Sequence, residues 1–108
     1  MVSEPAVPLR VDTEARGETV VLVLVGELDP HTAPTLRDHL DAAVDAETTT
    51  VVLDVAGLSF IDSSGLRVII AAHKDMDGRG GQLILRSPTT TTVRLLEITG
   101  LAEHLTVE

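Results

Sequence analysis

The sequence predicts an α/β domain: a mixed, mainly parallel β-sheet with helices packed on it. Short apolar runs typical of strands alternate along the chain with segments whose apolar residues recur every three or four positions, as on one face of a helix. The expected order is strand, strand, helix, strand, helix, strand, helix, strand. Strands joined through helices favour parallel pairing with right-handed crossovers, and an opening hairpin adds one antiparallel strand.

Length, composition and charge restrict the class of protein. With 108 residues, 44% of them apolar, the chain has room for one globular domain with one core. The formal net charge of −9 disfavours binding to nucleic acid or to an anionic membrane, which needs clustered Lys and Arg, and favours a protein partner. Without cysteine, neither a disulfide framework nor a thiolate metal site can form.

The N-terminus does not have the pattern of a signal peptide. Its opening residues, MVSEPAVPLR, contain neither a basic segment nor an apolar core, and no apolar run in the chain approaches the ~20 residues that span a bilayer. We therefore expect a cytoplasmic protein. Residues 1 to 8, which include Pro5 and Pro8, are expected to form a flexible lead-in to a single domain over residues 9 to 108.

An opening hairpin is the simplest interpretation of the residues that follow. Leu9, Val11 and Thr13 alternate with charged residues, the pattern of a strand with one solvent-facing side. A bend containing Gly17 comes next, and the apolar run from Val20 to Val25 predicts a buried second strand.

A strand-to-helix loop runs from Gly26 to Thr32. Pro30 cannot continue a β-ladder, and Asp29 or Thr32 can cap the following helix, whose apolar residues are Leu36, Leu40, Ala43 and Val44. Because the carboxyl ends of parallel strands meet at one edge of a sheet, we expect Asp29 on the same surface as the loop after the next strand. His31, in the same loop, is expected to be solvent-exposed.

The central stretch runs from Val51 to Met76. A β-branched and aliphatic run from Val51 to Val55, ended by Ala56-Gly57, is typical of a strand covered on both faces. A helix is expected to follow, with one apolar side formed by Leu66, Ile69, Ile70, His73 and Met76.

The segment Asp62-Ser63-Ser64-Gly65 is expected at the start of that helix. Asp62 or Ser63 can accept a hydrogen bond from a free first-turn amide, and Gly65 removes a side chain that would crowd this turn. One serine is then expected to have a structural role, and the neighbouring hydroxyl to be spare and outward-facing. Two interpretations stay open: a plain N-cap, or a phosphorylation site, since a helix N-terminus tolerates a phosphate.

The remaining elements are shorter. The run from Leu83 to Leu85 predicts a buried strand after a glycine-rich turn at residues 77 to 81, and Ser87-Pro88 ends it. Threonines 89 to 92 can cap a helix that Gly100 stops, and residues 105 to 107 can add a final strand.

The chain shows no catalytic or metal-binding pattern. A nucleophile elbow has the form Gly-x-Ser-x-Gly, but Ile61 occupies the place of the first glycine. His73 lies about two and a half turns along the same helix as the serines, beyond hydrogen-bond reach. The glycine-rich turn lacks the Lys-Ser or Lys-Thr of a phosphate-binding loop. We therefore predict a protein that is not an enzyme and has no cofactor and no metal.

Two motifs taken together resemble a known family. GELDPHTAPTLR, residues 26 to 37, and LSFIDSSGLRVII, residues 58 to 70, with this separation and order of elements, resemble the STAS-domain anti-sigma-factor antagonists of bacteria. The resemblance covers Leu9 to Val107, so residues 9 to 108 are expected to form a STAS domain. Family members bind, when unphosphorylated, a serine-kinase anti-sigma factor and so release the sigma factor. The kinase inactivates them by phosphorylation, and a PP2C-type phosphatase restores them.

The resemblance also implies site residues. The phosphoacceptor matches Ser64, with Ser63 as the alternative, and the acidic residues of the family beside and before the serines match Asp29 and Asp62. The surface that binds the partner kinase is then expected to comprise Asp29, Asp62, Ser63, Ser64, Gly65, Leu66 and Arg67. Arg67 departs from the family pattern, in which many members have glycine.

A second interpretation is a STAS module that serves another assembly, such as a stressosome-like scaffold or a lipid-transport complex. In that case Ser64 is a cap and no phosphorylation switch exists. The two interpretations differ in the partner that the chain recovers: an anti-sigma kinase in the first, scaffold or transporter subunits in the second.

Overall fold

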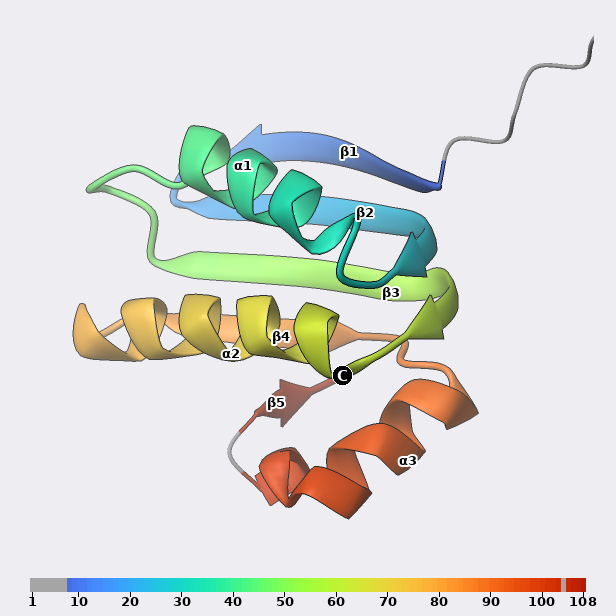
Figure 1. Ribbon diagram of the computed structural model, residues 1–108. Coiled ribbons are helices and arrows are strands. Elements are labelled where there is room, and N and C mark those ends of the chain that lie inside the picture. Colours follow the sequence, from blue (N-terminus) through green and yellow to red (C-terminus); the bar gives the residue numbers. More distant parts are fainter. Residues whose placement is uncertain (1–7, 104) are drawn as a thin grey trace, which may run out of the picture.

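The computed structural model describes residues 8 to 103 and 105 to 108 (Figure 1). The strands are β1 (Leu9–Arg16), β2 (Thr19–Leu28), β3 (Thr50–Ile61), β4 (Gln82–Arg86) and β5 (Thr106–Val107). The helices are α1 (Ala33–Ala43), α2 (Ser63–Gly78) and α3 (Thr90–Thr99), and a short 3-10 helix, η1 (Leu101–Glu103), follows α3. Apart from Pro8, the lead-in predicted for residues 1 to 8 lies outside the described residues.

The strands form one sheet in the order β1-β2-β3-β4-β5. β1 and β2 pair antiparallel, as the predicted hairpin, and each later pairing is parallel. The helices α1, α2 and α3 connect β2 to β3, β3 to β4 and β4 to β5 (Figure 1). The predicted α/β class, the mixed sheet and the order of elements are therefore confirmed.

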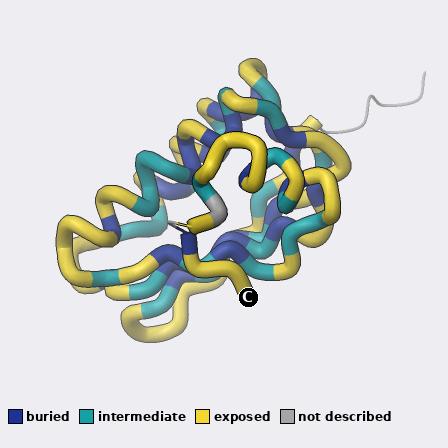
Figure 2. Tube along the Cα trace, turned by 90° about the horizontal axis from the view of Figure 1, so that it is seen from below, coloured by how far each residue is buried: buried dark blue, intermediate teal, exposed yellow. Residues whose placement is uncertain are grey.

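The three helices lie on one side of the sheet, and the core fills the space between the two layers (Figures 1 and 2). Right-handed crossovers that all advance in the same direction place every connecting helix on the same side. Alternate residues of the three inner strands point into this core and are almost fully buried: Leu22, Leu24, Val51, Leu53, Val55, Leu83 and Leu85. The helices contribute Leu36, Ile69 and Leu96.

The opposite face of the sheet carries no helix of the described residues (Figure 2). Val21, Val52 and Ile84 are neighbours in the strand register of this face. The residue pattern of the central strand is typical of cover on both faces, but only the face that carries the helices has a covering layer. Val52 is nevertheless only 4% exposed, because apolar side chains of both adjacent strands flank it.

Both central strands run further than predicted. β2 continues past Gly26 to Leu28, and β3 continues past Gly57 to Ile61. Two irregularities in their register take up the extra residues of β3. Glycine suits position 57, because a Cβ there would come within 2.9 Å of Val25 Cγ2. As a result, the two strands end level with each other.

The turns use the residues that the sequence indicates. β1 reaches Arg16, so the hairpin turn is tighter than predicted, and Gly17 adopts a positive φ of 60° within it. The Thr89 hydroxyl caps α3 by accepting the Thr92 amide at 3.2 Å. Gly100 ends α3 in the left-handed conformation, as predicted.

Candidate functional site

The ends of β2 and β3 place the predicted site residues at one edge of the sheet. Leu28 pairs with Ile61, and the Asp62 amide donates to the Leu28 carbonyl oxygen at 3.1 Å. The loop that begins at Asp29 therefore starts beside the first turn of α2, as expected from parallel strands. We call Asp29 and residues 62 to 64 the serine corner.

Asp62, and not a serine, caps α2. Its Oδ1 accepts the Ser64 amide at 2.9 Å and the Gly65 amide at 3.3 Å. The expectation that one serine has a structural role is wrong, because this carboxylate already satisfies two donors of the first turn. Within the residues that the structure describes, neither serine hydroxyl makes a hydrogen bond. Both hydroxyls are therefore spare; Ser63 is exposed and Ser64 is partly exposed.

Removal of this cap should destabilise the domain. We expect Asp62→Ala to lower the free energy of unfolding by ~1 kcal/mol, because two first-turn amides lose their acceptor. For a domain of this size, that corresponds to a fall in Tm of about 4–8 °C. Asp62→Asn is the matched control, since its side-chain oxygen still accepts and the stability should be retained. Thermal unfolding followed by circular dichroism measures both, and an unchanged Tm for Asp62→Ala would contradict the capping role.

Gly65 and Leu66, the two residues after the serines, are buried. Leu66 is 2% exposed, and Gly65 is buried against Leu28. A Cβ on Gly65 would lie 2.6 Å from Leu28 Cδ2, so the packing of α2 on β2 requires glycine here. These two members of the predicted partner surface hold the corner in place, whereas Ser63 and Arg67 are exposed and available for contact.

Asp29 is engaged within its own loop. Its Oδ1 accepts the amides of His31 and Thr32, each at 2.9 Å. The Thr32 hydroxyl donates to the Glu27 carbonyl oxygen at 2.8 Å, and Thr32 occupies the N-cap position of α1 without a side-chain cap bond. Neither predicted cap, Asp29 or Thr32, accepts a first-turn amide of α1 with its side chain; the Asp29 carboxylate instead holds the turn that leads into the helix. The hydrogen bond from the Thr32 amide, assisted by the His31 amide, lowers the pKa of Asp29 below its ordinary value.

The lowered pKa of Asp29 makes part of the stability depend on pH. Its contribution is present above the ordinary value of 3.8 and is lost as the pH falls through the lower pKa of the folded chain. Asp29→Asn keeps a side-chain oxygen but cannot titrate. We expect wild type to be the more stable protein above about pH 5, and the difference to shrink in acid. Urea unfolding of both proteins across this range measures the difference, and a pH-independent gap would contradict the assignment.

Phe60 also lies at this edge, and the sequence prediction did not include it. It stands two positions before Asp62 and is 46% exposed. It pairs with Glu27 in the sheet register and so lies on the helix-free face. One sequence signal could have found it: the only aromatic residue of the chain lies just before the aspartate that precedes the two serines, with Ile61 between them.

No hydrogen bond joins a described histidine to either serine. His39 Nδ1 lies 2.8 Å from a backbone carbonyl oxygen of its own helix. His73 lines a hollow between α2 and η1, and its Nδ1 is buried without a hydrogen-bond partner among the described residues. His31 is exposed in the loop before α1, as expected, and His104 lies outside the described residues. The described geometry therefore provides no base in contact with the serine hydroxyls.

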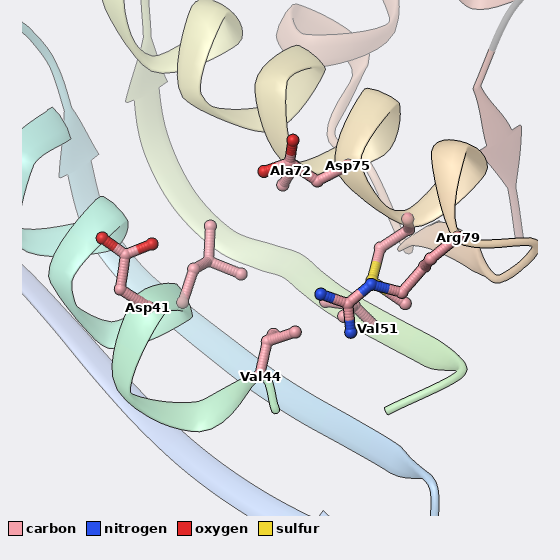
Figure 3. A pocket seen from close by; sticks show the side chains of 8 residues that line it. Asp41, Val44, Val51, Ala72, Asp75 and Arg79 are labelled. Atoms are coloured by element: carbon pink, nitrogen blue, oxygen red, sulfur yellow. The ribbon is translucent and has the colours of Figure 1, made fainter. Parts of the chain in front are cut away.

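A cavity of about 170 Å³ lies between α1 and α2 (Figure 3). Figure 3 shows the carboxylates of Asp41 and Asp75 on opposite helices, with Arg79 further along α2. The apolar part of the lining consists of Leu40, Val44, Val51, Ala72 and Met76. Ala72 lies about 12 Å further along the axis of α2 than Ser64, at ~1.5 Å per residue. The cavity is therefore separate from the serine corner.

The described part of the chain contains no group of three or more His, Asp or Glu side chains that could hold a metal ion. None of its helices combines the length and the apolarity that crossing a membrane requires.

Comparison with known proteins places this geometry in a family. A model of the STAS domain matches residues 10–108. An anti-sigma F factor antagonist of Lysinibacillus sphaericus is 36% identical over 85 residues, which cover 78% of this chain and 73% of that protein. The anti-sigma factor antagonist SpoIIAA in its unphosphorylated form aligns with a TM-score of 0.79 and 29% identity, covering 92% of this chain and 88% of that one. The phosphorylated form of the Bacillus cell fate determinant SpoIIAA aligns with a TM-score of 0.74 and 29% identity, covering 92% and 91%. Because the family model matches nearly the whole chain, the chain belongs to the STAS domain family.

Proposed function

We propose that this chain is an anti-sigma factor antagonist controlled by phosphorylation of Ser64. In its unphosphorylated form it binds a serine-kinase anti-sigma factor, and the sigma factor is released. The kinase then phosphorylates Ser64, with Ser63 as the alternative acceptor, and the modified chain no longer binds. A PP2C-type phosphatase restores the binding form. The chain acts in the cytoplasm as a substrate of the kinase and catalyses no reaction of its own.

The observation that carries the proposal is the pair of spare hydroxyls on the first turn of α2. Because the Asp62 carboxylate holds the Ser64 and Gly65 amides, neither serine side chain is needed to start the helix. A kinase can therefore modify either serine without removing a cap. The likeness to SpoIIAA structures in both an unphosphorylated and a phosphorylated form supports a fold that accepts a phosphate.

A phosphate on Ser64 changes the charge of the corner far more than its shape. It adds about −1.5 to −2 charge next to the Asp62 carboxylate, which already occupies two amides that could have bound phosphate oxygens. The helix dipole offsets only about 0.3–1 kcal/mol of this. Burying the dianion in an interface without a dedicated cation costs several kcal/mol, and about 1.4 kcal/mol is a tenfold change in affinity. The fold should persist while the complex dissociates.

Arg67 is assigned to the partner-binding surface. It is exposed, it follows Ser64 by three residues on the same face of α2, and it makes no ion pair among the described residues. In the free modified chain its guanidinium can pair with the phosphate. In the complex, we assign it a contact with the kinase, together with the exposed side of the serine corner.

Mapping of the phosphate tests the proposal. The chain is incubated with an anti-sigma serine kinase of the same organism and ATP, and the modified peptide is located by mass spectrometry. We expect one phosphate, on Ser64. Ser64→Ala should abolish the modification, Ser63→Ala should retain it, and a PP2C-type phosphatase should remove it.

Other results of the phosphate mapping would show whether the assigned site or the proposed function is wrong. A phosphate outside Ser63 and Ser64 contradicts the assigned site. A chain that no such kinase binds or modifies contradicts the function. If a pull-down then recovers scaffold or transporter subunits, the alternative of a STAS module without a phosphorylation switch replaces it.

A further inference from the structure

Phe60 is exposed although large aromatic side chains are usually buried. The side chain is 46% exposed near the end of β3, and the chain has no other aromatic residue. The core consists of Leu, Val, Ile, Ala and Met side chains and does not include the phenyl ring. Single exposed apolar residues are common, so the exposure becomes informative only through its surroundings.

A second exposed apolar residue lies on the same face of the sheet. Val25 is 45% exposed and pairs with Gly57, while Glu27, the next residue of β2 on this face, pairs with Phe60. Because position 57 has no side chain, β3 leaves Val25 uncovered on that side. We call Val25 and Phe60 the Phe60 patch. Glu27, the register partner of Phe60, and Ser59 are both exposed beside the patch, so polar side chains flank it.

The Phe60 patch adjoins the serine corner. Only Ile61, which is buried, separates Phe60 from the cap residue Asp62. α2 departs on the helix side of the sheet, whereas Phe60 faces the helix-free side. Phe60 and Ser64 therefore both lie close to the end of β3, and a protein that covers this edge of the sheet can contact both.

We propose that Phe60, together with Val25, is the apolar anchor of the partner-binding surface, and that the anti-sigma kinase covers it with an apolar pocket. This inference rests on the proposed function and adds the helix-free face of the sheet to the interface. The kinase is the occupant because the patch is continuous with the corner that it must reach to modify Ser64. Buried aromatic residues carry much of the binding energy of interfaces, so Phe60 supplies affinity and the phosphate on Ser64 removes it.

The single phenylalanine makes the contact directly observable. A chain labelled with 4-fluorophenylalanine carries fluorine only at Phe60. Without ATP, so that Ser64 stays unmodified, we expect one ¹⁹F resonance that shifts on addition of the kinase. We also expect it to lose most of its solvent isotope shift between H₂O and D₂O. The labelled chain phosphorylated on Ser64 should show neither change.

Binding measurements give a second readout. We expect Phe60→Ala to weaken kinase binding at least about tenfold in titration calorimetry. Val25→Thr, which keeps the shape but adds a hydroxyl, should weaken it by a smaller factor. Ile98→Ala is the control for loss of an exposed apolar side chain elsewhere, since Ile98 is 77% exposed on α3, and it should bind as wild type does. Phe60→Leu keeps an apolar side chain and should retain part of the affinity.

The outcomes distinguish the anchor from the function. A ¹⁹F resonance that saturating kinase leaves unchanged, or wild-type affinity in Phe60→Ala, overturns the anchor and leaves the proposed function intact. A kinase that neither binds nor modifies the wild-type chain overturns both. Should Phe60→Ala prove unfolded by circular dichroism, the ¹⁹F titration and Phe60→Leu still decide the question.

Discussion

Ser64→Asp is expected to abolish binding of the proposed anti-sigma kinase while the domain stays folded. Aspartate places a permanent carboxylate on the first turn of α2, beside the Asp62 carboxylate that caps it. Desolvating this charge in the interface costs several kcal/mol, so the Kd should rise by at least about 100-fold. The Ser64 hydroxyl takes no part in the cap, and Tm should therefore change by no more than about 4 °C.

Ser64→Asn separates charge from size in this experiment. Asparagine has nearly the shape of aspartate and carries no charge. We expect its Kd to stay within about tenfold of the wild-type value. Titration calorimetry with the purified kinase measures both variants, and circular dichroism checks that both are folded. Equal losses of affinity in the two variants would show that the switch does not act through charge.

Gly65→Ala is expected to destabilise the domain, although alanine is the better helix former. The substitution gains about 0.8–1.0 kcal/mol of helix propensity. The new methyl group would, however, lie 2.6 Å from Leu28 Cδ2, and Leu28 is 0% exposed in a filled core. Overpacking of this kind typically costs ~1–3 kcal/mol. Because the contact is so short, we expect a net loss of about 1–2 kcal/mol, with Tm falling by about 4–8 °C for each kcal/mol.

Gly78→Ala is the matched control in the same helix. It lies at the end of α2, where an added Cβ meets nothing within 4 Å. This variant should be neutral or more stable than wild type by up to about 1 kcal/mol. Urea unfolding of both variants measures the difference. If Gly65→Ala proves as stable as Gly78→Ala, α2 is free to move away from β2, and the serine corner is not held rigidly.

The parts of the fold that depend on short-range patterns were predictable. The spacing of Leu36 and Leu40 predicts α1, and a threonine run followed by Gly100 predicts the limits of α3. These signals suffice because helix periodicity and caps involve residues close together in the sequence. Parallel pairing then predicts that Asp29 and the serines begin from adjacent strand ends, as the pairing of β2 with β3 shows.

The strand ends were not predictable in the same way. Gly57 is a local signal for the end of a strand, yet β3 continues to Ile61 because β2 supplies pairing partners that far. The place where β3 ends also decides which residue caps α2. Asp62, paired through its amide to Leu28, stays extended with φ −124° and ψ −172°, so its carboxylate and not the Ser63 hydroxyl faces the free amides.

The α/β class, the order of elements and the segment that holds the candidate phosphoacceptor can be inferred from the sequence, because hydrophobic periodicity and turn residues are local properties. Three features emerge only in the folded chain: both serine hydroxyls are spare, Gly65 faces Leu28, and Phe60 remains outside the core. Each of these depends on the register between β2 and β3, which are distant in sequence. That register is set by backbone pairing and core packing over the whole sheet, and no short stretch of residues encodes it.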